Sequence, residues 1–140
     1  MILYQLKRVS QAKRIDTVVV ATSLSKSDDQ LAQVVQQAGY NLFRGSLDNV
    51  LERYYQCAKQ LGASSIIRLT GDCPFSSPDM IDFMVDRFTV GTYDYISNTA
   101  IESLLNVPDG LDVEIFTMAA LRRAWREATE QYEFEHVTPW

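Results

Sequence analysis

Cysteine and histidine are scarce in this sequence, and their scarcity excludes several classes of site. The 140 residues contain two cysteines, Cys57 and Cys73, which are too few for a disulfide framework and fit a reducing cytoplasm. His136 is the only histidine, which gives little basis for a histidine metal site or a Ser-His-Asp triad. We therefore interpret His136 as a packed or exposed helix residue.

Phosphate-loop motifs and long apolar runs are also missing. None of the six glycines forms a GxGxxG or GxxxxGK pattern. No apolar run approaches membrane length, and Lys7 and Arg8 interrupt the N-terminal one, so we expect neither a membrane span nor a signal peptide. The net charge of -5 argues against a nucleic-acid-binding surface. It does not argue against a nucleotide, because a triphosphate needs only a few local cations and a metal.

Short apolar runs with strand character alternate with stretches of helical periodicity. Hydrophobic residues make up 46% of the chain, which is typical of a globular domain, and the length fits one domain. We expect strands over residues 17–22, 40–43, 65–69, 93–96 and 111–116. We expect helices over 1–13, from a cap at Ser27 to Gly39, from a cap at Ser46 or Asp48 to Gly62, from about Ser77 to Gly91, and after a cap at Thr117. This alternation predicts an α/β domain with a mainly parallel sheet, and a polar loop over 98–110.

Asp72 is the first candidate for chemistry. It follows the apolar strand over 65–69 in a tight polar turn, and open α/β sheets bind their ligands at the carboxyl ends of their strands. The alternative is a turn aspartate that bonds to its own backbone. The local sequence leaves both interpretations open.

A second acidic candidate lies in the strand over 111–116. Side chains alternate along a strand, so Asp112 and Glu114 share one face and the apolar residues take the other. If that face meets Asp72, the three carboxylates form an oxygen-rich site suited to Mg²⁺. The alternative is a half-exposed strand with a solvated face.

Three arginines, Arg44, Arg53 and Arg68, are candidates to meet phosphate. Arg53 lies one helical turn beyond Asn49, so both face the loop end of their helix. Ser46 and the free N–H groups at that helix start offer an anion or base site. The alternative for each arginine is a solvated surface side chain.

The order of the motifs resembles a known family. The segments are VVVATS (18–23), FRGSLDNVLERYY (43–55), RLTGDCP (68–74), YISNT (95–99), PDGLDVE (108–114) and EHVTP (135–139). Together they resemble the acylneuraminate cytidylyltransferase family, within it most nearly the branch of the spore coat polysaccharide biosynthesis proteins. The resemblance covers essentially the whole chain.

The resemblance implies a three-layer nucleotide-diphospho-sugar transferase fold. It also implies an activity: transfer of CMP from CTP to an acidic sugar in cytoplasmic polysaccharide biosynthesis, with Mg²⁺ as cofactor and pyrophosphate as the product. No residue is assigned as the group that takes the sugar proton. By position, Asp72, Asp112 and Glu114 would bind metal, Asn98 would lie near the sugar, and Arg44, Ser46, Asn49 and Arg53 would lie near the nucleotide.

The chain departs from the family pattern at both ends. The family begins with a strand and a loop carrying glycine, arginine and lysine, whereas residues 1–6 resemble the helix after that loop, and the family continues past residue 139. We therefore expect residues 1–140 to form a single partial nucleotidyltransferase domain that is inactive alone. We expect either that another chain or a rearranged sheet fills the resulting gap, as a homodimer or by strand exchange, or that the sheet is compromised.

Two other functions fit the same residues. One is a non-catalytic module that binds sugar or a partner. The other is a related nucleotidyltransferase or glycosyltransferase that uses a different nucleotide.

Overall fold

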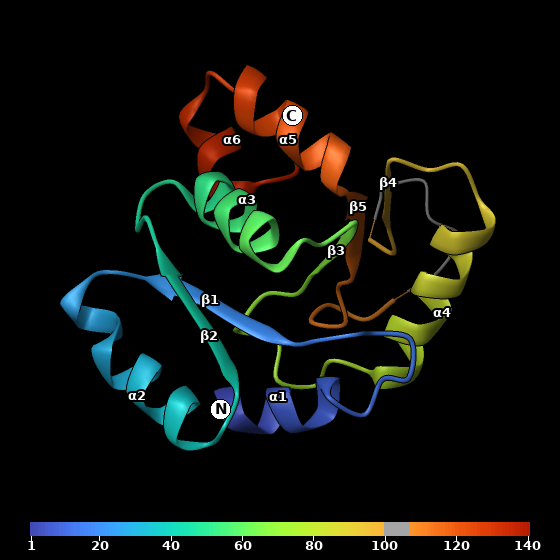
Figure 1. The fold of residues 1–140 in the computed structure, drawn as a ribbon. Helices are drawn as coiled ribbons and strands as arrows, with labels where there is room; N and C mark the ends of the chain where they lie inside the picture. Colours follow the sequence, from blue (N-terminus) through green and yellow to red (C-terminus); the bar gives the residue numbers. More distant parts are fainter. Residues whose placement is uncertain (100–106) are drawn as a thin grey trace. The chain divides into compact units, whose positions relative to one another are not determined.

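The computed structural model describes residues 1–99 and 107–140, in which helices and strands alternate along the chain (Figure 1). The predicted polar loop over 98–110 includes residues 100–106, which lie outside the described residues. The chain forms two compact units: Met1–Val18 with Ser65–Phe116 (unit 1), and Val19–Ser64 with Thr117–Trp140 (unit 2). Each unit is described by itself below.

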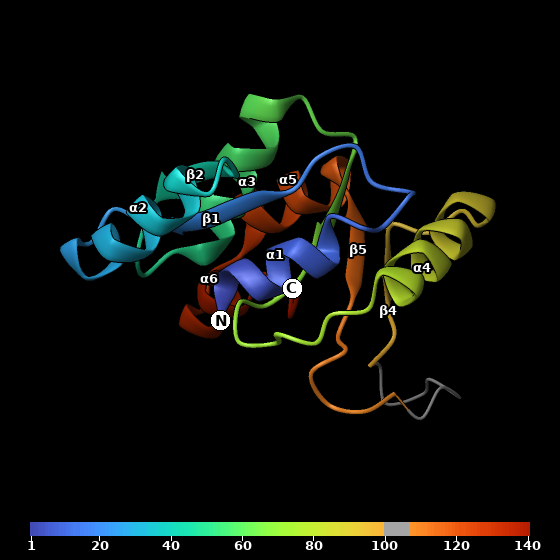
Figure 2. The same ribbon diagram turned by 90° about the horizontal axis from the view of Figure 1, so that it is seen from below.

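Unit 1 is built around a three-stranded sheet. Its strands are β3 (Ser65–Arg68), β4 (Tyr95–Ser97) and β5 (Glu114–Thr117), in the order β3-β5-β4. β4 and β5 are antiparallel, with Ile96 opposite Ile115 and Ser97 opposite Glu114. The unit also contains α1 (Ile2–Val9) and α4 (Pro78–Val90), and α4 lies beside β4 (Figure 2).

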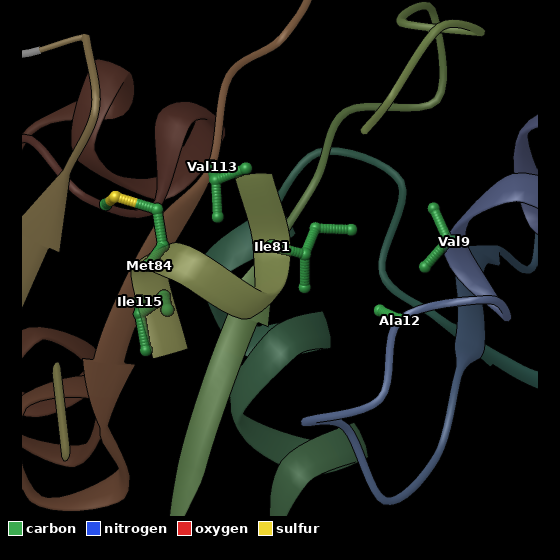
Figure 3. Packing of buried hydrophobic residues seen from close by; sticks show 6 residues of the cluster. All are labelled: Val9, Ala12, Ile81, Met84, Val113 and Ile115. Atoms are coloured by element: carbon green, nitrogen blue, oxygen red, sulfur yellow. The ribbon is translucent and has the colours of Figure 1, made fainter. Parts of the chain in front are cut away.

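The core of unit 1 forms where α4 meets the chain around β5. Ile81 and Met84 of α4 are buried together with Val113 and Ile115, and α1 and the turn after it add two small side chains, Val9 and Ala12 (Figure 3). Burying each large apolar side chain contributes about 1.5–3 kcal/mol. The strand predicted over 111–116 is displaced, because β5 begins only at Glu114. Strand alternation therefore places Glu114 on the face opposite the buried Ile115 but does not apply to Asp112, which lies before the strand.

Unit 2 is built around a parallel pair of strands. β1 (Val19–Ser23) and β2 (Asn41–Gly45) pair in register from Val19 opposite Asn41 to Ser23 opposite Gly45. The helices are α2 (Asp29–Gln37), α3 (Val50–Leu61), α5 (Met118–Glu127) and α6 (Gln131–His136), and a short 3-10 turn, η1 (Lys26–Asp28), precedes α2. α3 packs against both strands and against α5 and α6 (Figure 1).

The predicted α/β class is confirmed, with one parallel and one antiparallel strand pair defined by register. The helix start near Ser77 and the cap at Thr117 are confirmed, because the hydroxyls of Ser77 and Thr117 accept hydrogen bonds from the N–H groups of Met80 and Ala120. Gly62 ends α3 in the left-handed region, with φ of 63°.

Three predicted helix boundaries are wrong. α1 ends at Val9 rather than at residue 13. Ser27 does not cap the second helix, since Ser25 caps η1 and α2 begins only at Asp29. The third helix is capped by Asn49, whose side chain accepts from Glu52 N–H, rather than by Ser46 or Asp48.

Within residues 1–99 and 107–140, no helix is long and apolar enough to cross a membrane.

Candidate functional site

Asp72 is an exposed carboxylate in the turn after β3. Its pKa is lowered, first by a hydrogen bond from the side chain of Thr70, then by its own backbone N–H and by Cys73. The thiol of Cys73 lies 3.6 Å from Asp72 Oδ1 and 3.1 Å from Thr70 Oγ1. Asp72 therefore makes the backbone contact expected of a turn aspartate. Its carboxylate is nevertheless ionised and exposed, so it is still available for binding.

A buried glutamine from α1 holds this turn in place. Gln5 is 4% exposed, and its Nε2 donates to the carbonyl of Thr70 at 2.8 Å and to Ser76 Oγ at 3.2 Å. Ser76 Oγ in turn donates to the carbonyl of Cys73 at 2.9 Å. Gln5 was not predicted as a site residue, although its place on the buried face of α1 with Leu6 and Val9 was a usable signal.

Asp112 lies just before β5, in the field of other carboxylates. Burial raises its pKa first, and the negative charges of Asp109, Glu114 and Asp72 raise it further, while Arg68 lowers it. The charge of Asp72 thus acts on Asp112, while the predicted metal role of the two residues stays a prediction. Like charges gathered in this way are relieved by a cation.

Glu114 is already paired. Arg68 of β3 donates to Oε2 in an ion pair, and the hydroxyl of Tyr95 donates to Oε1 at 2.8 Å. The side chains of Arg68 and Glu114 are only 17% and 13% exposed. Both oxygens of Glu114 therefore serve protein donors, which makes it less available to a metal than Asp72 or Asp112.

Within the described part of the chain, no three or more His, Cys, Asp or Glu side chains form a complete metal-binding cluster. Magnesium does not require one, because it is commonly held by one or two carboxylates together with substrate phosphates and waters. Asp72 and Asp112 fit this pattern, since both carry carboxylate oxygens, the ligands that Mg²⁺ prefers.

Asn98, predicted near the sugar, is 1% exposed and turned to the main chain. Its Nδ2 donates to the carbonyl of Leu111, and its Oδ1 accepts from the N–H of Val113, both at 2.8 Å.

In unit 2, three of the predicted nucleotide residues meet at the start of α3. Ser46 Oγ accepts from Asn49 N–H at 3.0 Å, and Asn49 Oδ1 accepts from Glu52 N–H at 2.8 Å. Arg53 Nη1 donates to the carbonyl of Ser46 at 2.6 Å. The structure therefore brings Ser46, Asn49 and Arg53 together.

Arg53 keeps an unused donor. Its Nε is buried and lacks a hydrogen-bond partner among the described residues, and burial lowers the pKa of the guanidinium. Gly45 makes room for this side chain, because a Cβ at that position would lie 3.0 Å from Arg53 Cγ and 3.1 Å from Phe43 Cε1.

Arg44, the fourth predicted nucleotide residue, holds the loop after β1. Its Nε and one terminal nitrogen donate to the carbonyls of Ser23 and Ser25 at 2.8 and 2.9 Å, and it forms an ion pair with Asp29 at 2.8 Å. Its charge is therefore already used within unit 2. The candidate residues thus fall into an acidic set in unit 1 and a basic, helix-start set in unit 2.

The chain matches the family model described as "Cytidylyltransferase" over residues 1–140. The chain belongs to the cytidylyltransferase family. The finer assignment to the acylneuraminate or spore coat branch stays a prediction.

Two curated relatives are similar to most of this chain. "Uncharacterized protein MJ1063" of Methanocaldococcus jannaschii is 38% identical over 135 residues, which is 96% of this chain and 53% of that protein. "Spore coat polysaccharide biosynthesis protein SpsF" of Bacillus subtilis is 37% identical over 126 residues, or 88% of this chain and 49% of that protein. The chain spans about half the length of these relatives.

Two solved structures share the fold. A cytidylyltransferase from Leptospira borgpetersenii has a TM-score of 0.91 at 31% identity, covering 99% of this chain and 58% of that one. A CMP:2-keto-3-deoxy-manno-octonic acid synthetase complexed with CTP has a TM-score of 0.72 at 15% identity, covering 98% of this chain and 71% of that one. The second likeness supports the fold alone.

Proposed function

We propose that this chain belongs to an enzyme that transfers CMP from CTP to an acidic sugar for surface polysaccharide biosynthesis. The observation that carries the proposal is the match of residues 1–140 to the cytidylyltransferase family. Within that chain, the exposed Asp72 follows β3 and Asp112 lies just before β5. The polysaccharide context rests on the name of the similar spore coat polysaccharide biosynthesis protein. The acidic sugar rests on a relative from Geobacter sulfurreducens, 33% identical over 84 residues, whose name is 3-deoxy-manno-octulosonate cytidylyltransferase. The free thiols of Cys57 and Cys73 fit the cytoplasm, which we propose as the location.

In the proposed reaction, a sugar hydroxyl oxygen attacks the α-phosphorus of CTP in line with the leaving pyrophosphate. The bond between the sugar oxygen and the α-phosphorus forms as the α–β phosphoanhydride bond breaks. Pyrophosphate leaves, and the hydroxyl proton is released. When bound, Mg²⁺ supplies charge neutralisation at the phosphate oxygens. Asp72 and Asp112 would hold it, while Glu114 keeps Arg68 beside them as a fixed positive charge.

Ser46, Asn49 and Arg53 of unit 2 are the residues that we propose lie near the nucleotide. Arg53 donates to the carbonyl of Ser46, and the Ser46 hydroxyl accepts from the N–H of Asn49, so the donors at the start of α3 are held in a fixed arrangement. Preorganised donors of this kind stabilise the charge that develops on transferring phosphoryl groups.

Two measurements test the proposal, each made on the wild-type protein and on two variants. Asp72→Asn is the test variant, and Asp79→Asn, in the first turn of α4, is its matched control. Pyrophosphate release is followed with CTP, Mg²⁺ and a panel of acidic sugars, and CTP binding is titrated with and without Mg²⁺. We expect Asp72→Asn to abolish the Mg²⁺-dependent part of CTP binding and to reduce any turnover about 10²–10³-fold, with Asp79→Asn unchanged.

Other outcomes would contradict or support separate parts of the proposal. Preference for UTP or GTP would overturn the cytidyl assignment. Unchanged Mg²⁺-dependent binding in Asp72→Asn would overturn its metal role. CTP binding without turnover by the 140-residue chain would agree with our expectation that it is inactive alone, whereas turnover would contradict it.

A further inference from the structure

Asn98 continues the pairing of β4 with β5 beyond the last backbone bridge. The antiparallel register ends at Ser97 opposite Glu114. At the next residue, the N–H of Asn98 donates to the carbonyl of Val113 at 3.3 Å. The side chain then makes its two 2.8 Å bonds, to the carbonyl of Leu111 and from the N–H of Val113. The Asn98 side chain thus makes hydrogen bonds to residues 111–113 of the kind that the backbone of a neighbouring strand would make.

The two peptide groups that this amide engages flank Asp112. Fixing the carbonyl before a residue and the N–H after it restricts the backbone dihedral angles that set the direction of its side chain. Val113, 1% exposed, anchors the same segment in the core of unit 1 (Figure 3). The backbone at Asp112 is therefore fixed by the two hydrogen bonds of Asn98 and by the packing of Val113 in the core.

Such a restraint has a physical use at this site. Asp112 lies in the field of Asp109, Glu114 and Asp72, all of the same sign. On an unrestrained segment, repulsion would favour conformations that move its carboxylate away from the other three. An amide that is itself nine-tenths or more buried and doubly bonded opposes that movement at the backbone.

We propose that Asn98 is a positioning residue that holds Asp112 in place for metal binding, rather than a residue that touches the sugar. This inference rests on the proposed function, in which Asp72 and Asp112 are the metal ligands. An asparagine suits the task because one planar group carries both a donor and an acceptor. Aspartate keeps only the acceptor at neutral pH, and leucine, of similar size, keeps neither.

The test measures Mn²⁺ binding to the 140-residue protein by electron paramagnetic resonance of the free ion. We expect Asn98→Leu to weaken Mn²⁺ binding about 10–100-fold, the range found when residues behind metal ligands are changed. In an Asp112→Asn background the same change should have no further effect, because Asn98 then has no ligand to position. Ser77→Ala, which removes the cap of α4 in the same unit, is the control and should bind Mn²⁺ as the wild type does.

Asn98→Asp is the second variant, in case Asn98→Leu fails to fold in a thermal melt. Its added negative charge would by itself strengthen cation binding, so weaker Mn²⁺ binding can only report lost positioning. Stronger binding, or an Asn98→Leu effect that persists fully in Asp112→Asn, would overturn the inference. Absence of Mn²⁺ binding by the wild type, or unchanged binding by Asp112→Asn, would instead overturn the proposed metal site.

Discussion

At the scale of single residues, Asp28 fixes the loop that follows β1. Its Oδ2 accepts hydrogen bonds from the hydroxyls of Thr22 and Ser23, both at 2.6 Å, and from the N–H of Ser23 at 2.9 Å. These bonds, led by the Ser23 hydroxyl, lower the pKa of Asp28 from 3.8 to about 2. Because these bonds occupy its carboxylate, Asp28 lies in the 3-10 turn η1 and its side chain does not cap α2.

This depressed pKa predicts a pH-dependent contribution to stability. The folded-state pKa lies below the unfolded one, so the contribution is present above about pH 4 and is lost as the pH falls toward 2. We expect Asp28→Asn to lower the free energy of unfolding at pH 7 by about 1 kcal/mol, after allowing for solvent screening. Urea denaturation between pH 7 and pH 3 should show the difference from wild type shrinking in acid.

Asp29→Asn is the matched control for this prediction. Its only described ion pair, with Arg44, is 58% exposed on the aspartate side and should contribute less than about 0.5 kcal/mol. A difference between Asp28→Asn and wild type that stays constant with pH would show that the carboxylate charge is not the cause.

At the scale of elements, the helix starts show where sequence patterns compete. Ser46, Asp48 and Asn49 all have side chains that can cap α3, and only Asn49 does so, with Oδ1 2.8 Å from Glu52 N. We expect Asn49→Ala to lower the free energy of unfolding by about 1 kcal/mol, the usual value of a cap, and Asp48→Ala to have little effect. Chemical denaturation of the two variants at neutral pH separates them, and equal losses would contradict the assignment of the cap.

The elements themselves follow from local periodicity, which is why the sequence predicts them well. The stripe of Ile81 and Met84 and the alternation at Val113 and Ile115 are visible in the sequence, and these four side chains do form a core. The alternation also places Glu114 on the face opposite Ile115, whereas Asp112 lies before β5 and outside this pattern. Local chemistry thus predicts which residues share a face.

Partners distant in sequence could not be predicted in the same way. Arg68 pairs with Glu114 across 46 positions, and Gln5 bonds to the Asp72 turn across 65. Each pairing depends on how strands and helices come together, which no local pattern encodes. Asn98 was singled out by resemblance, but its contacts with Leu111 and Val113 were not foreseen.

At the scale of the whole molecule, the chain passes between its two units three times. Neither unit is continuous in sequence, since unit 1 ends its first segment at Val18 and resumes at Ser65, and unit 2 resumes at Thr117. Each has its own buried centre, with Ile81 at 1% exposure in unit 1 and Leu51 at 0% in unit 2. Bringing the two segments of a unit together closes a loop through the other unit, and folding of that intervening segment lowers the entropy cost of the closure, which favours one cooperative domain.

This connectivity predicts that the two units unfold in a single transition. We expect Ile81→Ala and Leu51→Ala each to lower the free energy of unfolding by about 2–5 kcal/mol, through lost burial and the cavity left behind. Because we predict one domain over residues 1–140, both variants should shift the same single calorimetric transition. Two transitions, one moved by each variant, would show that the units unfold independently. Repeating the scans at tenfold higher protein concentration tests the predicted self-association, because the midpoint of a dimer rises with concentration and that of a monomer does not.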